Sequence, residues 1–338
     1  MSDESRLALI TISPGDDWLQ RLRLLAPSLH FEQLAPEAVT PELWRRAEIV
    51  YWSGGPFPAP EQVPALRWVQ LHSAGANRIL MQPLFRTDVV FTTTSGIHAI
   101  NITEHVFAML LAWTHHVPRV LEWQARREWP PEDRRWSLFV PQELWGKTIG
   151  IAGYGSIGRQ VARVAKGFGM RVRALQHGDD PRDYGFTLRG VGDPDGVMPE
   201  RYYRPEELHE MLAASDFVVI ALPLTPQTKD LFDESAFAAM KPGAFLVNIA
   251  RGGVCDEAAL YRALHDGHIA GAALDVFGEE PLPPESPLWQ LPNVLLSPHI
   301  AGFTPEYDNR GMRVFAENLG RYLAGEPLVN VVDKQLGF

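Results

Sequence analysis

The sequence is poorest in cysteine: it has one, Cys255, so no disulfide can form within the chain and no site can bind a metal through several cysteines. Basic residues are fewer than acidic ones, 31 against 41, and the net charge of −10 disfavours a nucleic-acid-binding surface. No apolar run reaches the roughly 18 residues that a membrane helix needs, and a signal-peptide pattern is lacking at the start. We therefore expect a cytoplasmic protein without a metal site, a nucleic-acid partner or a membrane anchor.

Apolar and charged residues, by contrast, occur in the proportions of an ordinary globular protein, 46% and 21%. A chain of 338 residues is long for one domain and suggests two or three. Arginines gather only within residues 126–135, where acidic residues interrupt them, so we interpret this stretch as a solvated charged face.

The first hundred residues alternate apolar runs with helical patterns. We predict strands at residues 7–12, 29–34, 48–52, 66–71 and 89–93, and helices at residues 18–25 and 41–47. This alternation is typical of a parallel sheet with helices on its faces. Small-residue loops follow the last three strands, at residues 53–55, 73–77 and 95–96, which is the edge where parallel sheets bind ligands.

A second series of strands and helices occupies the centre of the chain. A long helix is predicted from Ile102 through Trp113 and past Pro118 with a kink, followed by an irregular connection at residues 134–144. Further strands are predicted at residues 171–175, 216–221, 244–249, 269–274 and 294–296, and helices at residues 205–213, 234–240 and 257–266.

Two segments stand outside this alternation. Residues 178–203 are rich in Gly, Pro and Asp without periodicity, and we expect a long surface loop there. A last amphipathic helix is predicted at residues 306–323, ended by Gly325, and a strand at residues 329–332 would close the chain. This helix is expected to return to the first sheet, so that one domain is inserted into the other.

A glycine-rich turn connects the apolar run 149–152 to the helical pattern that follows it. Gly153 would form the tight turn, Gly155 would let the backbone approach a pyrophosphate, and Gly158 would let the helix pack on the strand. The helix N-terminus would offer N–H groups and a partial positive charge to the phosphates. Glycines also cluster in ordinary turns, but a strand before and a helix after this motif predict a dinucleotide site.

Three polar residues, Arg251, Glu280 and His299, follow successive strands of the central series. The planar fork of an arginine suits a carboxylate, and a histidine exchanges protons near neutral pH. A carboxylate hydrogen-bonded to a histidine orients the ring and favours its charged form. Together with a nicotinamide, these groups can interconvert a 2-hydroxy acid and a 2-keto acid.

Each of these residues also has a simpler structural interpretation. Taken alone, the histidine would be a cap after a strand, the arginine a surface ion-pair partner, and Glu280 a loop carboxylate. Asp275, at the end of a strand, could equally cap a turn or a helix. Other histidines, including His72 and His105, are interpreted as structural.

The order of several motifs resembles that of the D-isomer-specific 2-hydroxyacid dehydrogenase family. The resemblance spans nearly the whole chain, and it is carried by residues 143–158, 221–228, 248–253, 274–281 and 297–302, with weaker similarity at residues 73–77 and 103–105. It implies an α/β fold of two doubly wound parallel-sheet domains, a Rossmann cofactor domain inserted into a flavodoxin-like substrate domain. We place the substrate domain at residues 1–118 and 303–338 and the cofactor domain at residues 119–302, with a cleft between them and a homodimer as the assembly.

The resemblance also implies roles for individual residues. Arg251, Glu280 and His299 would be the catalytic set, acting on a small 2-hydroxy or 2-keto acid without a metal. Gly75 and Ala76 would bind the substrate carboxylate through main-chain N–H groups, together with Arg251 and His299. The implied cofactor-binding residues are Gly153, Gly155, Ser156, Ile157, Gly158, Gln176, Leu222, Pro223, Thr228, Ile249, Ala250, Arg251, Asp275, His299, Ala301 and Gly302.

The choice of cofactor stays open between NAD and NADP. Relatives that use NAD place an acidic residue where Gln176 stands, and without its charge a 2′-phosphate is not repelled. No arginine follows directly, however, and Asp179 and Asp180 are close in the sequence. The segment 178–203 is a second departure from the family pattern, and it lies where the adenosine end is expected.

Two alternatives to this dehydrogenase remain. One is a non-catalytic, dinucleotide-sensing binding protein like the corepressor branch of the same fold, which can keep the Arg, Glu and His residues. The other is an enzyme like formate dehydrogenase, which carries Gln where Glu280 stands. The identity of the 2-keto acid is not predicted by the sequence.

Overall fold

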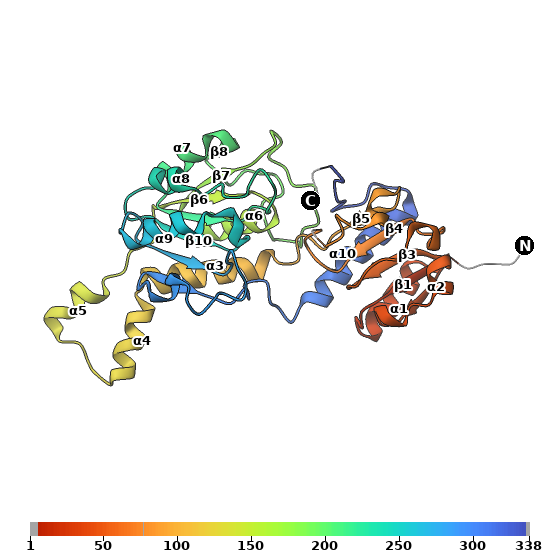
Figure 1. Ribbon diagram of the computed structural model, residues 1–338, viewed down its shortest axis with the longest axis horizontal. Coiled ribbons are helices and arrows are strands. Elements are labelled where there is room, and N and C mark those ends of the chain that lie inside the picture. Colours follow the sequence, from red (N-terminus) through yellow and green to blue (C-terminus); the bar gives the residue numbers. More distant parts are fainter. Residues whose placement is uncertain (1–5, 77, 336–338) are drawn as a thin grey trace, which may run out of the picture. The chain divides into compact units, whose positions relative to one another are not determined.

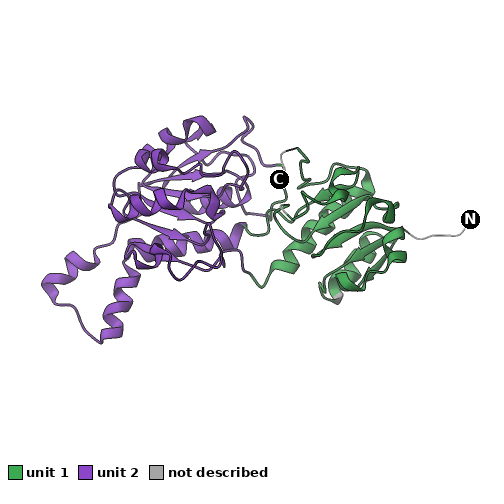
Figure 2. Cartoon of the chain, viewed as in Figure 1, with its two compact units in different colours: residues 1–98, 184–188, 304–338 green, residues 99–183, 189–303 purple. Residues whose placement is uncertain are grey.

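The computed structural model describes residues 6–76 and 78–335. These residues form two compact units, which Figure 2 distinguishes by colour. Unit 1 contains the described residues up to 98, residues 184–188 and those from 304 onward, and unit 2 contains residues 99–183 and 189–303. The first bound predicted from the sequence lies after residue 118, whereas the units divide after residue 98. The difference is α3 (Ala99–Thr114), which packs on α6 (Ser156–Gly167) of unit 2.

Unit 1 is built on a five-stranded sheet with the strand order β2-β1-β3-β4-β5. All neighbouring strands are parallel, and this order is that of flavodoxin-like folds. Its strands are β1 (Arg6–Ile10), β2 (Leu29–Gln33), β3 (Ala47–Trp52), β4 (Trp68–Leu71) and β5 (Val90–Thr92). Its helices are α1 (Asp16–Leu25), α2 (Pro41–Arg46) and α10 (Tyr307–Ala324).

The C-terminal helix α10 belongs to this first sheet and completes its core. Trp68 of β4 is fully buried and stacks on Phe315 and Tyr322 of α10, with ring centroids 5.2 and 5.6 Å apart. The Trp68 indole N–H donates to Thr92 Oγ1 at 2.8 Å, so its polar atom is satisfied inside the core. The helix ends at Gly325, whose left-handed φ of 70° is readily adopted by glycine, as the sequence predicts.

Unit 2 is built on a seven-stranded sheet with the order β12-β11-β10-β9-β6-β7-β8. Its strands, all parallel, are β6 (Thr148–Ala152), β7 (Arg171–Leu175), β8 (Arg201–Tyr203), β9 (Phe217–Ile220), β10 (Phe245–Asn248), β11 (Gly271–Leu274) and β12 (Val294–Leu296). The chain reverses its direction of winding between β6 and β9, which is the switch point where doubly wound sheets bind ligands. The predicted fold class is confirmed by the two parallel sheets.

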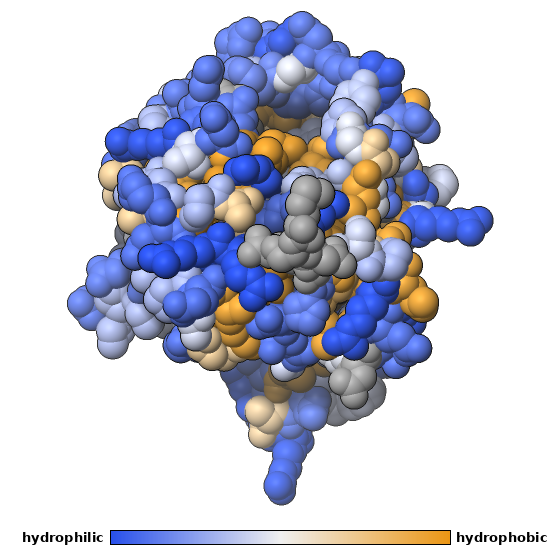
Figure 3. Space-filling view, turned by 90° about the vertical axis from the view of Figure 1, so that its right-hand side faces the viewer, coloured by the Kyte–Doolittle hydropathy of each residue, from blue (hydrophilic) through white to orange (hydrophobic). Residues whose placement is uncertain are grey.

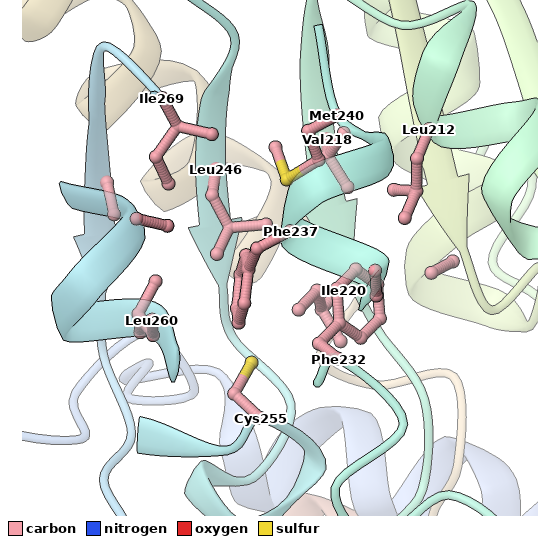
Figure 4. Close-up of a cluster of buried hydrophobic side chains, with 14 of the residues drawn as sticks. Leu212, Val218, Ile220, Phe232, Phe237, Met240, Leu246, Cys255, Leu260 and Ile269 are labelled. Carbon is pink, nitrogen blue, oxygen red and sulfur yellow. The ribbon is translucent and has the colours of Figure 1, made fainter. Parts of the chain in front are cut away.

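Helices cover both faces of this sheet. One face packs against α7 (Leu208–Ala213), α8 (Glu234–Ala239) and α9 (Glu257–His265), and Figure 4 shows the side chains of this core. The other face packs against α3 and α6. Cys255 lies in the first core, where burial raises the pKa of its thiol well above the ordinary value. The thiol is therefore held protonated and is poorly suited to act as a nucleophile.

The segment after α3 differs from the prediction. In place of one kinked helix, α3 ends at Thr114 and a separate helix α4 (Val117–Arg126) begins after His116, whose φ of 54° is left-handed. Pro118 lies in the first turn of α4, where its missing N–H costs no hydrogen bond. The irregular connection predicted at residues 134–144 overlaps helix α5 (Glu132–Phe139), whose first turn carries acidic residues that favour a helix N-terminus.

Two other predictions are corrected. Residues 178–203 are not a surface loop throughout, because residues 201–203 form β8 beside β7, Asp193 is buried, and residues 184–188 belong to unit 1. The strand expected at residues 329–332 is reduced to one antiparallel bridge between Val331 and Thr92. In both places the outcome depends on backbone hydrogen bonds to a strand that is distant in the sequence. The local pattern of residues therefore does not predict it.

Within the described residues, no helix is long and apolar enough to span a membrane, and no group of three or more His, Cys, Asp or Glu side chains is placed to hold a metal ion. Figure 3 views the end of the molecule that lies on the right in Figure 1. Hydrophilic residues form most of its visible surface, and apolar residues lie in smaller areas between them.

Candidate active site

The glycine turn follows β6 at the switch point of the unit 2 sheet (Figure 1). Gly153 has a φ of 102°, and a Cβ built there would lie 2.6 Å from the carbonyl oxygen of Ala221 after β9. A Cβ on Gly158 would lie 2.2 Å from the Gly153 oxygen and 3.0 Å from the Ile151 side chain. Both positions therefore require glycine, one for the turn and one for the packing of α6 on β6.

Gly155 is different, because neither its backbone conformation nor its neighbours in the structure require glycine. Its φ of −84° suits any residue, and a Cβ there would have no described atom within 4 Å. The position opens outward immediately before Ser156 and Ile157, the first residues of α6. A ligand that approaches the helix N-terminus would gain from the missing side chain, since backbone N–H groups there can bind phosphate oxygens.

The loop after β9 is held together by Thr228. Its hydroxyl donates to the Pro223 carbonyl at 2.5 Å and accepts from the Thr225 N–H at 2.8 Å. The hydroxyl of Thr228 therefore forms hydrogen bonds within the loop. The loop places Leu222 and Pro223 at the edge of the sheet. Both are half-buried or exposed at the carboxyl end of β9.

Arg251 stands at the carboxyl end of β10. Ile249 and Ala250 before it are buried, and its Nη1 donates to the Ala250 carbonyl at 2.6 Å. A Cβ on Gly252 would lie 2.0 Å from the Phe277 oxygen, so glycine lets the two loops after β10 and β11 touch. This close approach brings Arg251 beside the loop that carries Glu280.

His299 and Glu280 form a hydrogen-bonded pair. The distance between His299 Nδ1 and Glu280 Oε2 is 2.7 Å, and both side chains are partly exposed, 46% and 35%. Glu280 Oε1 also accepts the Phe277 N–H at 3.0 Å. Burial by itself would raise the pKa of Glu280, but the His299 and Phe277 hydrogen bonds and the charges of His299 and Arg251 outweigh it, so the pKa is lowered. The ionised carboxylate can only accept, so Nδ1 must carry a hydrogen.

Asp275 anchors the loop that carries His299. Its buried carboxylate accepts three hydrogen bonds, from Ser297 Oγ at 2.6 Å, the Ile300 N–H at 3.0 Å and the Ala301 N–H at 2.9 Å. His299, between these partners, has a left-handed φ of 54°. Separating this buried carboxylate from its three donors would cost a large free energy. The hydrogen bonds therefore hold the His299 loop in this conformation.

Two contributors to this anchor, His105 and Asn101, were missed in the sequence. His105 Nε2 lies 3.2 Å from Ser297 Oγ, and because that hydroxyl donates to Asp275, the histidine must donate to it. Burial lowers the pKa of His105, although the charge of Asp275 acts in the opposite direction. Asn101 adds a bond from its amide to the Ala301 carbonyl at 2.9 Å. The only hint in the sequence is the similarity at residues 103–105.

Gln176 lies at the end of β7, as its place in the sequence predicts. Its amide donates to the carbonyls of Gly178 and Asp180, at 2.8 and 3.3 Å, and so holds the following turn. Arg204, which follows β8, pairs with Asp179 and donates to the His177 carbonyl at 3.3 Å. A cavity of about 190 Å³ is bordered by Gln176, Gly178, Asp179 and Arg204, and Tyr202 and Tyr203 also line it.

In unit 1, the predicted substrate loop follows β4. Ser73 Oγ donates to the Gly75 carbonyl at 2.7 Å, which closes a tight turn, and the Thr94 N–H donates to the Ser73 carbonyl at 3.1 Å. Gly75 is exposed and Ala76 is buried. Asn77, the last residue of the predicted loop, lies outside the described residues.

Comparison with known proteins identifies the family. Residues 107–301 match the family model described as D-isomer specific 2-hydroxyacid dehydrogenase, NAD binding domain. The chain belongs to the D-isomer specific 2-hydroxyacid dehydrogenase family. A glyoxylate reductase from Pyrococcus furiosus is 39% identical over 82% of this chain and 78% of that protein.

Solved structures agree with this assignment. A D-isomer specific 2-hydroxyacid dehydrogenase from Xanthobacter autotrophicus, in complex with NADPH and MES, has a TM-score of 0.77 at 29% identity and covers 99% of this chain and 100% of its own. An NADPH-dependent glyoxylate/hydroxypyruvate reductase from Sinorhizobium meliloti, with NADP and sulfate bound, has a TM-score of 0.72 at 25% identity over 98% of this chain and 99% of its own.

Membership of this dehydrogenase family confirms the predicted class of reaction. The chain is an NAD(P)-dependent oxidoreductase that interconverts 2-hydroxy acids and 2-keto acids. The prediction of an enzyme is confirmed as well, against the alternative of a non-catalytic binding protein. The cofactor class, NAD or NADP, agrees with the family model and with the two complexes.

Proposed function

We propose that this enzyme reduces glyoxylate, or a 2-keto acid of similar size, to the 2-hydroxy acid, with Arg251, Glu280 and His299 as its catalytic set. The observation that carries the proposal is the 2.7 Å hydrogen bond between His299 Nδ1 and Glu280 Oε2 beside the loop of Arg251. The glyoxylate reductase named above supports the substrate class.

His299 acts as the general acid in this proposal. Its Nδ1 hydrogen is held by Glu280, which leaves Nε2 as the nitrogen that exchanges a proton with the substrate. A nicotinamide bound beside these residues would supply the hydride for the carbonyl carbon. The Nε2 proton moves to the carbonyl oxygen, the 2-hydroxy acid is formed, and the imidazolium returns to neutral imidazole. In the oxidative direction Nε2 accepts the proton from the hydroxyl group.

In this proposal Arg251 binds the carboxylate of the substrate. The guanidinium offers a planar fork to the carboxylate and draws electron density from the carbonyl oxygen. We assign the main-chain N–H groups of Gly75 and Ala76 to the same carboxylate. A small acid is proposed because Arg251, His299 and the backbone donors recognise only a carboxylate and a carbonyl. Glyoxylate has no other functional group.

The dinucleotide would lie along the carboxyl edge of the unit 2 sheet. Its pyrophosphate is assigned to the backbone at Gly155, Ser156 and Ile157, where the missing Cβ of Gly155 leaves room. The nicotinamide end is assigned to the loops after β9, β10 and β11, including Leu222, Ile249 and Asp275. Since Gln176 carries no charge, we propose that NADPH is accepted as well as NADH.

A direct assay tests the proposed reaction. Purified enzyme is mixed with glyoxylate, hydroxypyruvate, pyruvate and a branched 2-keto acid in turn, each with NADH and with NADPH, and nicotinamide absorbance is followed. We expect the highest kcat/KM for glyoxylate or hydroxypyruvate. Turnover of the branched acid alone, or of none of the four, would overturn the proposal.

We also propose that the enzyme works as a cytoplasmic homodimer. Helices α4 and α5 extend from the rest of unit 2 in Figure 1, and none of the residues described in α4 or α5 is buried. Apolar side chains along this arm are exposed, with Trp129 at 83%, Trp136 at 79% and Leu121 at 55%. Exposed aromatic and aliphatic groups in one place are typical of an interaction surface, and a second copy of the chain is the proposed occupant.

Light scattering after gel filtration tests this assembly. Leu121→Glu combined with Trp136→Glu should convert the dimer into a monomer, because two charges would be buried without partners. Met81→Glu is the control, since Met81 is 84% exposed and lies outside the arm. A monomeric wild-type enzyme, or a dimer that the arm variant leaves intact, would contradict this interface.

A further inference from the structure

Within the segment 178–203, which the family pattern does not account for, Asp193 is hydrogen-bonded to the glycine turn. We propose that its residues 192–198, called the brace below, hold the glycine turn and the start of α6 in the conformation that binds the dinucleotide. Tyr154 and Asp193 are then positioning residues for cofactor binding. This inference rests on the assignment of the pyrophosphate to that turn.

Tyr154 connects the glycine turn to the brace. It stands between Gly153 and Gly155, yet its side chain is only 5% exposed. Its hydroxyl donates to Asp193 Oδ2 at 2.7 Å. The ring lies 4.8 Å from the Arg159 guanidinium and meets the Tyr202 ring edge-on at 5.5 Å. The middle residue of the turn is thus fixed on several sides, and burial, with Asp193, raises its pKa well above the ordinary value, so the hydroxyl stays a donor.

Asp193 is the centre of the brace. Its side chain is 2% exposed, and its carboxylate accepts the N–H groups of Val197 and Met198, at 3.1 and 2.9 Å, in addition to the Tyr154 hydroxyl. Its main-chain carbonyl accepts from Arg159 Nη1 at 2.7 Å. A buried carboxylate must keep such donors, because leaving it without them costs a large free energy. The brace is therefore costly to rearrange, and Tyr154 is bonded to the carboxylate at its centre.

The brace also clamps the first turns of α6. Gly192 donates its N–H to Gln160 Oε1 at 2.7 Å and accepts from Arg163 Nε at 2.6 Å. Arg159, on the same helix, is 4% exposed and pairs with Asp183 at 3.6 Å. The N–H groups at the start of this helix are those assigned to the pyrophosphate. The brace consequently sets both parts of the site, the turn and the helix end.

A preorganised turn binds a dinucleotide more tightly, because less conformational entropy is lost on binding. Loosening the brace should therefore raise the dissociation constant of the cofactor and its KM. The carbonyl chemistry uses residues at other strand ends, so kcat and the KM of the 2-keto acid should change little. A bond that served only to stabilise unit 2 would lower the melting temperature without this split between cofactor and substrate.

Tyr154→Phe is the main test, with Tyr322→Phe as its matched control. Tyr322 also donates to a carboxylate, Glu48 Oε1, at 2.8 Å, but it belongs to unit 1, whereas the turn belongs to unit 2. We expect Tyr154→Phe to raise the dissociation constant of NADPH or NADH about tenfold, which corresponds to about 1.4 kcal/mol. Tyr322→Phe should leave it unchanged. Quenching of tryptophan fluorescence by the dinucleotide measures both.

Asp193→Asn should have a larger effect than Tyr154→Phe. An amide has one oxygen, so either Val197 or Met198 loses its acceptor and faces an NH2 group instead. Where the NH2 group takes the Oδ2 position, the Tyr154 hydroxyl loses its acceptor too, so in the double variant the rise should be smaller than the sum of the two single effects.

The outcomes separate this inference from the proposed reaction. Unchanged cofactor affinity in Tyr154→Phe, with a melting temperature lowered as in Tyr322→Phe, would overturn the brace as a positioning device. Equal rises in the KM of cofactor and of 2-keto acid would overturn it too. A wild-type enzyme that bound the dinucleotide but reduced none of the 2-keto acids would contradict the reaction and leave the brace standing.

Discussion

The two ends of the proposed dinucleotide site are built in different ways. At the His299 loop, a buried carboxylate, Asp275, receives three hydrogen bonds, and His299 itself is bonded to Glu280. At the end of β7, the contacts are exposed ion pairs, between Arg204 and Asp179 and between Arg182 and Asp180. Buried networks resist change, whereas exposed ion pairs contribute little and are easily exchanged.

Because of this difference, we expect different residues to determine the rate of the reaction and the preference between NADH and NADPH. The geometry of proton transfer must be kept within a fraction of an ångström, so it is set by atoms that cannot move without losing partners. The 2′-position of the ribose needs only a suitable charge and enough space. We therefore expect substitutions at the His299 loop to change turnover, and substitutions at Gln176 to change the preference between NADH and NADPH.

The largest effect is expected from His299→Ala. Loss of the general acid should lower kcat by about 10²–10⁴-fold, while the dissociation constant of the dinucleotide, measured by fluorescence, should stay nearly unchanged. His265→Ala is a suitable control, because His265 is exposed and pairs with Asp266 on the surface. Activity near the wild-type level would remove His299 from the catalytic set.

Asp275→Asn should have the next largest effect. The amide keeps the shape but has one acceptor oxygen for three donors, so at least one N–H or O–H of the loop loses its partner. We expect a loss of about 1–3 kcal/mol in the free energy of unfolding, measured with urea, together with a lower kcat. If kcat stayed unchanged while stability fell, the anchor would serve the fold and not the position of His299.

Gln176→Asp should act on cofactor preference alone. The new carboxylate would repel a 2′-phosphate and bind the ribose hydroxyls, so the ratio of kcat/KM for NADH over NADPH should rise by about tenfold. Gln176→Asn is the control, because it loses the same bonds to Gly178 and Asp180 without adding charge. An equal ratio in the two variants would show that the discriminating position lies elsewhere.

The smallest effect is expected from pH. Burial lowers the pKa of His105, so below its ordinary value of about 6.5 the unfolded chain binds a proton that the folded chain does not. Stability should therefore fall as the pH drops from 7.5 to 5.5. His105→Gln keeps a donor for Ser297 but cannot titrate, so its urea midpoint should fall less over the same range. An identical decline would assign the pH dependence to other groups.

Much of the fold could be predicted because it depends on the pattern of residues that are close together in the sequence. The apolar runs matched most strands to within two residues. Glycine marked the turn at Gly153, the close packing of α6 at Gly158 and the end of α10 at Gly325. The pairing of His299 with Glu280 was also expected, since a carboxylate and a histidine at adjacent strand ends of a parallel sheet meet at one edge.

The failures share a physical cause, which is dependence on distant partners. Residues Arg201–Tyr203 form strand β8 because they pair with the edge of β7. A pattern of three residues is too short to predict such a strand. His105 contacts Ser297 across 192 positions of the sequence, so no local signal assigned it to the His299 loop. Asp193 was hidden in a segment whose composition is typical of surface loops.

The sequence by itself determined the parallel-sheet class, the dinucleotide motif and the three polar residues of the candidate active site, because strand periodicity, glycine and charge act over a few neighbouring residues. Only the tertiary structure decided how those residues are held: by Asp275 and Ser297 behind His299, and by Asp193 behind the glycine turn. Such supports are hydrogen bonds between groups far apart in the chain, and they come into existence only when burial removes water as the competing partner.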